Sequence, residues 1–283
     1  MNADVTIRKM MEADIPAGMR LCEIAGWNQV ERDWQRFLEL EPDGCFVAEL
    51  DGEVRATVTT LRYESRFAWL GMLLTDPNTR RQGLGTRLLE QGCLYLENAG
   101  VETVRLDGTP MGHSLYLQRG FEDEYEIQRW EGAPSFQGGK GLPLMTPSDL
   151  DAVSALDRHI FGADRSPLLN SLWHENPLLS AVLRQGKEIT GYLFGREGSR
   201  TRYLGPWVAL SRAAAEQLLQ GMLSRFPDQK TYVDLCLKNP DAISVAQAFG
   251  FKFQRMLTRM CRGPNRYPGA PHFVYGIAGP ELG

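Results

Sequence analysis

Apolar positions follow two spacings along this chain, and together they predict a fold that mixes strands with helices. Short alternating or continuous apolar runs predict strands at residues 5–9, 45–50, 53–63 and 69–75. Apolar residues spaced by three and four positions predict helices over residues 12–25 and 30–40, and again from Leu88 to Leu96. Asp51-Gly52, between two strand-like runs, predicts a hairpin turn. The pattern indicates an α/β fold.

A basic, glycine-containing loop joins the strand at 69–75 to the helix that follows it. Asp76-Pro77-Asn78 predicts a turn, and residues 80–85 then read RRQGLG. Glycine has no side chain to keep an anion away, and the amide groups at a helix N-terminus attract negative charge. The loop therefore predicts a phosphate-bearing ligand. It lacks the Lys-Ser/Thr pair of a Walker loop and the third glycine of a dinucleotide fingerprint.

A second motif about 30 residues further on gives the loop a context. Residues 114–121 read SLYLQRGF, with a tyrosine on a predicted helix and Gly-Phe at the start of the next strand. The first 130 residues or so resemble the GCN5-related N-acetyltransferase (GNAT) superfamily. Its coenzyme A motif, Arg/Gln-x-x-Gly-x-Gly/Ala, is matched by Arg80, Gly83 and Gly85, and its later motif by Tyr116, Gly120 and Phe121.

The resemblance implies a mostly antiparallel central sheet flanked by helices, with acetyl-CoA as the cosubstrate. The backbone of Leu73, Leu74 and Thr75 would pair with the pantetheine arm as an additional strand. The loop would wrap the pyrophosphate. The residues expected to bind acetyl-CoA are therefore Leu73, Leu74, Thr75, Arg80, Arg81, Gln82, Gly83, Leu84, Gly85, Thr86, Thr109 and Tyr116.

Two residues are the candidates for the chemistry. Tyr116 is predicted to protonate the leaving thiolate, because the resemblance places its hydroxyl near the sulfur; the alternative is a core tyrosine. Asp107, at the end of a predicted strand, could accept the proton of the amine or bind its ammonium group. It could equally be a cap or turn residue, given the Gly108-Thr109-Pro110 that follows.

Four further residues are weaker candidates. Glu64 could serve as a second base, and His113 as a proton relay, although a surface histidine is the simpler interpretation. Trp27 and Asn28 lie between the first two predicted helices. In the superfamily, this segment shapes the acceptor site. An aromatic wall with one amide would suit a small, partly apolar amine, and core packing is the alternative for Trp27.

The second half of the chain repeats the first without its chemistry. Residues 142–150 restate the opening strand and helix start, and Gly250-Phe251 follows Gly120-Phe121 by 130 residues. Residues 210–215, in the place of the basic loop, contain no glycine, and residues 242–248 contain no tyrosine. The arrangement resembles a subgroup of bacterial tandem acetyltransferases whose second repeat is degenerate.

The predicted division of the chain has four parts. Residues 1–131 form a catalytic domain, 132–142 a glycine-rich linker, 143–262 a degenerate domain that walls the acceptor pocket, and 263–283 a C-terminal coil. A length of 283 residues agrees with two domains.

Composition excludes several classes of function. A net charge of −4 without a basic stripe argues against nucleic-acid binding. The five cysteines and four histidines lack ligand spacing, so no metal site or disulfide framework is expected. The absence of an 18-residue apolar run and of an apolar N-terminal core predicts a cytoplasmic protein that does not enter membranes.

The leading hypothesis is an acetyl-CoA-dependent N-acetyltransferase acting on the primary amine of a small molecule, as a monomer or homodimer. Two alternatives stay open: a non-catalytic acyl-CoA sensor or scaffold, and an acetyltransferase that modifies a protein amine.

Overall fold

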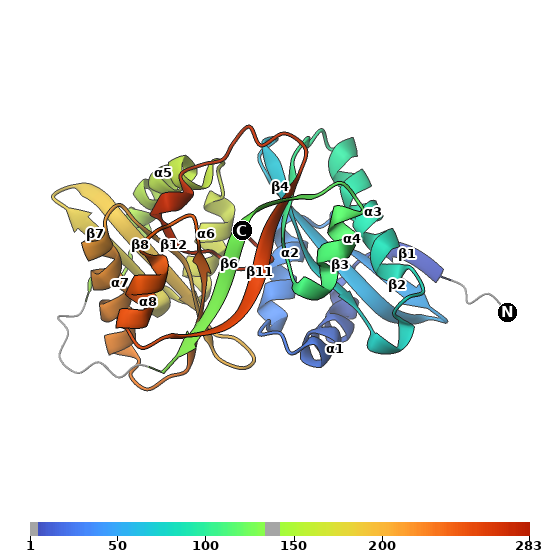
Figure 1. Ribbon diagram of the computed structural model, residues 1–283, viewed down its shortest axis with the longest axis horizontal. Helices are drawn as coiled ribbons and strands as arrows, with labels where there is room; N and C mark the ends of the chain where they lie inside the picture. The colour runs from blue at the N-terminus through green and yellow to red at the C-terminus, as the bar shows by residue number, and fades with distance from the viewer. Residues whose placement is uncertain (1–4, 134–141) are drawn as a thin grey trace.

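The computed structural model describes residues 5–133 and 142–283, and its elements repeat in the two halves of the chain (Figure 1). The first half contains β1 (Val5–Lys9), α1 (Ile15–Ala25), α2 (Glu31–Leu40), β2 (Phe46–Leu50), β3 (Glu53–Tyr63), β4 (Phe67–Thr75), α3 (Leu84–Asn98), β5 (Val104–Gly108), α4 (Pro110–Leu117) and β6 (Glu122–Gly132). The second contains α5 (Leu150–Phe161), α6 (Ser166–Glu175), β7 (Ser180–Gln185), β8 (Glu188–Arg196), β9 (Arg202–Ala209), α7 (Arg212–Arg225), β10 (Thr231–Cys236), α8 (Ala242–Ala248), β11 (Lys252–Arg262) and β12 (Val274–Gly276).

The strands of both halves join one twelve-stranded sheet in the order β1-β2-β3-β4-β5-β11-β6-β10-β12-β9-β8-β7. Most neighbours in it are antiparallel, as the resemblance implied, and helices cover its faces (Figure 1). The mixed α/β class and the tandem organisation are therefore confirmed.

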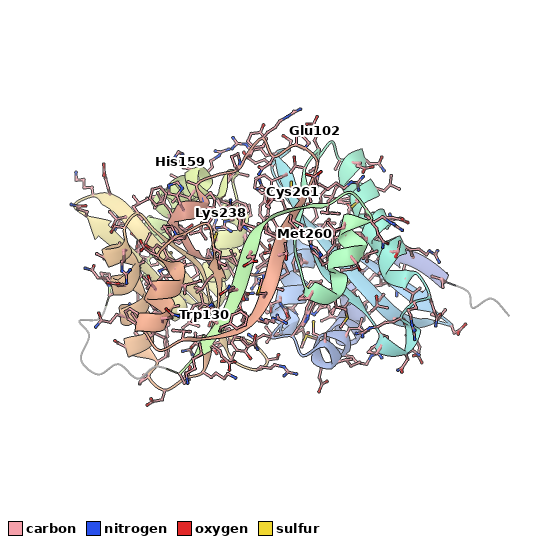
Figure 2. All side chains as sticks on the ribbon, viewed as in Figure 1. Glu102, Trp130, His159, Lys238, Met260 and Cys261 are labelled. Carbon is pink, nitrogen blue, oxygen red and sulfur yellow. The ribbon has the colours of Figure 1, made fainter. Side chains whose placement is uncertain are left out.

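The two repeats exchange their last strands at the centre of the sheet. β11, from the second half, pairs with β5 through Met260 and Leu106, and β6, from the first half, pairs with β10 through Trp130 and Val233. β6 and β11 also pair with each other, and Figure 2 labels Trp130 and Met260 on these adjacent strands. Residues 1–131 and 143–262 are thus repeats in sequence, but each repeat completes the sheet of the other.

The core also crosses from one repeat to the other. Trp34 and Trp69 of the first half belong to the same buried cluster as Leu168 and Tyr192 of the second. Burial of such side chains stabilises each by about 1.5–3 kcal/mol, so the halves are bound by a shared core as well as by the sheet.

Each repeat contains one short parallel pair whose strands then diverge. β4 and β5 pair at Ala68–Val104 and Trp69–Arg105, and β9 and β10 pair from Arg202–Thr231 to Leu204–Val233. In the second repeat β12 enters the gap, bonded to β10 on one side and to β9 on the other. In the first repeat, within the described residues, no strand fills the gap.

Two expectations differ from the structure, and one lies largely outside the residues that it describes. The C-terminal segment 263–283 was expected to be coil, but residues 274–276 form β12, a strand too short to show periodicity in sequence. The strand expected near residue 144 is reduced to one bridge, Leu144–Ala181. Residues 134–141 of the expected linker lie outside the described residues. Among the described helices, none is both long and apolar enough to cross a membrane.

Candidate functional site

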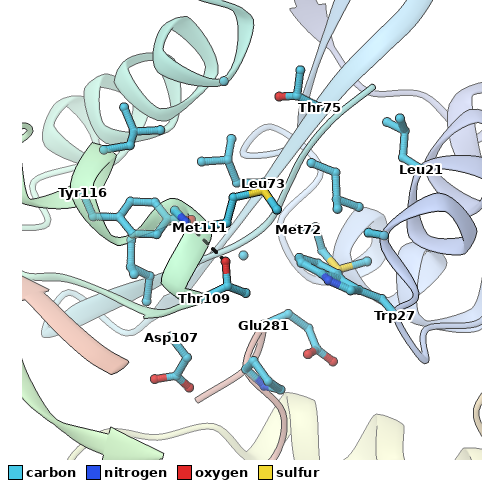
Figure 3. Close-up of a pocket in the computed structure, with 18 of the residues that line it drawn as sticks. Leu21, Trp27, Met72, Leu73, Thr75, Asp107, Thr109, Met111, Tyr116 and Glu281 are labelled. Atoms are coloured by element: carbon cyan, nitrogen blue, oxygen red, sulfur yellow. Dashed lines mark hydrogen bonds between the residues drawn. The ribbon is translucent and has the colours of Figure 1, made fainter. Parts of the chain in front are cut away.

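A cleft of about 770 Å³ lies where β4 and β5 diverge (Figure 3). β4, the loop after it, α3, β5 and α4 form one wall, and α1 and the segment after it supply Leu21 and Trp27. The second half of the chain contributes Arg255, Met256 and Leu257 from β11 and Pro280 and Glu281 from the C-terminal segment. The cleft therefore belongs to both repeats.

A β-bulge in β4 shapes the side of the cleft that faces β5. Thr57 pairs with Leu74 and Thr59 with Gly71, so β4 carries one residue more than β3 between these pairs. Met72 has a φ of 48° there. Beyond Trp69, β4 has no strand partner on the β5 side in the described part of the chain. The backbone of Leu73–Thr75 can therefore bond an extended ligand, which fits the pantetheine arm expected from the sequence.

The basic loop lies at the mouth of this cleft. Gly83, with a φ of 80°, is the N-cap of α3, and a Cβ placed on it would meet no atom within 4 Å. The first amide groups of a helix have no partner within the helix, so those of α3 are available to an anion. Arg80 and Arg81 are exposed and form no ion pair with any described residue. Except for Gln82, the residues from Arg80 to Thr86 line the cleft.

Asp76 fixes the turn that leads into this loop. Its carboxylate accepts a hydrogen bond from the Asn78 amide at 3.0 Å and contacts Arg55 at 3.0 Å and Arg20 at 3.2 Å. Burial would raise the pKa of this carboxyl group, but the Asn78 amide and the two guanidinium groups outweigh it and lower the pKa. Asp76 therefore stays ionised and anchors the loop to β3 and α1.

Tyr116 lies on α4 with its ring packed edge-on to Phe121, 6.0 Å between ring centres. Thr109 caps α4 by accepting a hydrogen bond from the Gly112 amide at 3.3 Å (Figure 3). Burial raises the pKa of Tyr116 to about 12, so the phenol is protonated at neutral pH. Its hydroxyl has no hydrogen-bond partner among the described residues, and the side chain lines the cleft. Tyr116 can therefore donate a proton to a group bound there.

Asp107 also lines the cleft, but its carboxylate is occupied. Its two oxygens accept hydrogen bonds from Arg259 Nε at 2.8 Å and Nη2 at 2.9 Å, and its side chain is 0% exposed. Burial raises the pKa of Asp107, and the Arg259 guanidinium, stacked on Trp69, opposes that rise. This pair joins β5 to β11, so the structure argues for a structural role and against proton acceptance by Asp107.

Glu64 and His113 lie outside the cleft. Glu64, at the turn between β3 and β4, pairs with Arg66 and Arg158 and accepts a hydrogen bond from the Asp164 amide at 3.1 Å. It connects the two repeats, so the structure does not support it as a base. His113 Nε2 lies 2.8 Å from a carboxylate oxygen of Asp123 on the surface.

Trp27 and Asn28 are adjacent in sequence but have different surroundings. Trp27 projects into the cleft (Figure 3). The Asn28 amide is committed to the loop between β8 and β9: Nδ2 donates to the Thr201 carbonyl at 2.8 Å, and Oδ1 accepts from the Arg200 and Thr201 amides, each at 3.0 Å. Asn28 therefore positions the β8–β9 loop of the second repeat and is not among the residues that line the cleft.

Three polar residues of the cleft were not candidates from sequence. Gln29 Oε1, Arg255 Nε and Glu281 Oε2 are buried atoms without a hydrogen-bond partner among the described residues. Nothing in the local sequence singles them out, because their chemistry comes from where the tertiary structure places them. Unpaired buried polar atoms cost about 1–3 kcal/mol each, so they indicate a place for a polar ligand.

Comparisons with known proteins agree with this geometry. Residues 17–121 match the model described as acetyltransferase (GNAT) family, and residues 153–276 match the one described as acetyltransferase (GNAT) domain. The chain belongs to the GNAT acetyltransferase family. Two matches in tandem also confirm that the second half of this GNAT protein is a repeat of the first.

Relatives of this GNAT protein extend over most of its length. Holothin acyltransferase of Pseudoalteromonas sp. is 27% identical over 91% of this chain and 87% of its own. The solved structure of a Pyrococcus horikoshii protein has a TM-score of 0.84 at 24% identity, covering 99% of this chain and 96% of that one. A tandem GNAT protein from the clavulanic acid biosynthesis pathway has a TM-score of 0.63 at 14% identity, covering 93% and 100%. These two structures show the shared fold. The protein is an enzyme of the N-acyltransferase class.

Proposed function

We propose that this GNAT enzyme transfers the acetyl group of acetyl-CoA to the primary amine of a small molecule. The observation that carries the proposal is the two-ended cleft. One end has helix amides and two arginines, Arg80 and Arg81, that form no ion pair with any residue the structure describes, and both features suit a pyrophosphate. The other end has apolar walls with a few unpartnered polar atoms, which suits a small amine.

The residues of the first repeat fit acetyl-CoA along the whole wall. The loop from Arg80 to Thr86 would hold the pyrophosphate, and the unpaired edge of Leu73–Thr75 would bond the pantetheine amides. Acetyl-CoA supplies the thioester carbonyl that the amine attacks. Tyr116, held protonated by burial, would give its proton to the departing sulfur.

The second repeat supports a small acceptor. β11 and the C-terminal segment close the cleft with Arg255, Met256, Leu257, Pro280 and Glu281, which leaves less room for a folded protein. The relative named holothin acyltransferase supports acyl transfer as the reaction.

The first experiment tests the cofactor end by isothermal titration with acetyl-CoA. Gly83→Glu places a carboxylate where the phosphates are expected, so binding should be lost. Gly186→Glu is the matched control, because Gly186 also has a positive φ, 64°, and an open Cβ position, but lies in the turn between β7 and β8. Retained binding in Gly83→Glu would refute the assignment of the loop.

The second experiment screens amines by the release of free CoA thiol. The panel contains 2-phenylethylamine, tryptamine, polyamines, aminoglycosides and amino acids, in pairs with and without a carboxylate, because Arg255 forms no ion pair within the described chain. Turnover of at least one amine is expected. Acetyl-CoA binding without turnover of any amine would contradict the small-molecule function and favour a sensor or a protein substrate.

A further inference from the structure

The C-terminal segment runs from the gap between β9 and β10 of the second repeat to the cleft of the first repeat. Its strand β12 fills the gap between β9 and β10, where Tyr275 packs on Trp207 at 5.0 Å between ring centres. The chain then crosses to β4 of the first repeat. Trp69 Nε1 donates to the Pro280 carbonyl at 2.9 Å, and the Tyr63 hydroxyl donates to the Leu282 carbonyl at 2.5 Å. The segment thus fills the gap between β9 and β10 in the second repeat and then enters the cleft of the first.

The course of the C-terminal segment places the Glu281 carboxylate in the cleft. Glu281 is 3% exposed, and its Oε1 accepts a hydrogen bond from Arg196 Nη2 at 2.7 Å. Its Oε2 has no partner among the described residues. Glu281 and Trp27 both project into the cleft (Figure 3). Because buried carboxylate oxygens normally accept a hydrogen bond, we expect a ligand in the cleft to donate one to Oε2.

The charges around Glu281 favour a cationic donor. Arg196 also contacts Asp33 at 3.4 Å, Arg36 contacts Asp33 at 2.8 Å, and Arg36 pairs with Glu175. This buried network holds Glu281, Asp33 and Glu175 against two arginines, so it carries one uncompensated negative charge.

The other arginines of this wall, Arg129 and Arg255, interact electrostatically with Glu281, but neither forms an ion pair with it within the described chain. Arg129 is held by both oxygens of Asp234, at 2.8 and 2.6 Å. Arg255 forms no ion pair with Glu281 or with any other residue that the structure describes. Burial raises the pKa of Glu281 and Asp33 adds to the rise, while Arg196 and, to a smaller extent, Arg129 oppose it. A carboxylate with a raised pKa is a better proton acceptor near neutral pH.

We propose that Glu281 is the group that binds the ammonium form of the acceptor and takes its proton, with Arg196 as its positioning residue. The inference rests on the proposed function and narrows it. The acceptor is a primary amine that binds as a cation, with an apolar body against Leu21, Ile24, Trp27 and Met72.

The proton balance is complete without another reactant. One N–H proton of the ammonium passes to Glu281 Oε2 and from there to solvent, which frees the lone pair of the nitrogen. The N–C bond forms as the C–S bond breaks. The sulfur takes the Tyr116 proton, and Tyr116 regains one from the acylated nitrogen. The ammonium and thioester become an amide, a thiol and one proton.

Glu281→Gln tests this role because it keeps the size of the side chain and an oxygen for Arg196. The probe is the fastest amine of the panel above. At pH 7, kcat/KM should fall about 10²-fold, the lower part of the range for general acid–base catalysis. The loss should shrink as the pH approaches the pKa of the amine, about 10.4 for an alkyl ammonium like that of lysine, because a neutral amine needs no base.

A second readout is independent of turnover. Calorimetry of the same amine with the enzyme free of acetyl-CoA should show roughly tenfold or more weaker binding in Glu281→Gln, since a buried charge loses its partner. Glu197→Gln is the matched control, because Glu197 follows Arg196 but is 57% exposed and pairs with Arg202 outside the cleft. It should behave as wild type. Glu281→Asp, which keeps the charge, should recover part of the lost rate.

The outcomes separate the two proposals. Turnover by wild type with an equal rate in Glu281→Gln, or a loss that is constant with pH, would overturn the role of Glu281 and leave the acetyltransferase function standing. Loss of acetyl-CoA affinity in Glu281→Gln would show a structural role and would also overturn it. No turnover by wild type would remove the proposed function itself.

Discussion

The docking of the C-terminal segment on β4 depends on the absence of a side chain at Gly71. A Cβ at this position would lie 2.9 Å from the Cα, the Cβ and the carbonyl oxygen of Glu281. Ordinary contacts between carbon atoms are about 3.5–4.0 Å, so Gly71→Ala must displace the segment by roughly 0.5–1 Å. Such a shift lengthens the bonds from Trp69 and Tyr63 to the segment and moves the Glu281 carboxylate.

The cost can be estimated from these contacts. Overpacking a close contact destabilises by about 1–3 kcal/mol, and each weakened hydrogen bond adds up to about 0.5–1.5 kcal/mol. We expect the free energy of unfolding to fall by about 2–4 kcal/mol. Hydrogen exchange of residues 274–283 should become faster, and kcat/KM for the amine should fall while acetyl-CoA affinity is retained.

The control is Gly186→Ala, which adds the same methyl group where no atom lies within 4 Å. It should cost about 1 kcal/mol for its left-handed backbone conformation and leave both the exchange of the C-terminal segment and the amine kinetics unchanged. Equal exchange of residues 274–283 in Gly71→Ala and wild type would refute the packing argument.

Two further predictions concern the first repeat. Tyr116→Phe should lower kcat about 10²-fold while calorimetry shows unchanged acetyl-CoA affinity, and an unaltered rate would remove Tyr116 from the mechanism. The Asp76 carboxyl has a lowered pKa in the folded protein, so its stabilising effect is complete above the unfolded pKa of about 3.9 and is lost as the pH falls below it. Urea unfolding should therefore show Asp76→Asn to be less stable than wild type at pH 7 and closer to it at pH 3; an equal difference at both would contradict the assignment.

Part of the candidate site could be predicted from short segments of the sequence. A strand, a turn, two glycines and a helix start form a unit whose predicted anion binding would use its own backbone amides, so Gly83 and Gly85 could be singled out without tertiary information. Tyr116 was predicted from the resemblance of the short segment around it to the later GNAT motif, and the structure places its side chain at the cleft. The order of strands and helices also followed from periodicity, because burial of one face leaves its spacing in the sequence.

The roles of the charged residues depended on partners far away in the chain. Asp107 was a plausible base until Arg259, 152 residues later, was found to hold both of its oxygens. Glu64 and Asn28 likewise proved to bind segments of the second repeat. A carboxylate or amide has the same sequence signature whether its partner is a substrate or a distant backbone group.

The sequence by itself predicted the repeat, the order of most of its elements and the glycine-containing loop, because the residues that specify each element lie close to one another in the chain. Tertiary structure alone decided the exchange of β6 and β11, the filling of the gap between β9 and β10 by β12 and the position of Glu281 in the cleft. These features arise from pairings between segments that are distant in the chain, such as Arg129 and Asp234 across a separation of 105. Such pairings depend on which strand edges and apolar faces remain uncovered after the helices and strands have formed.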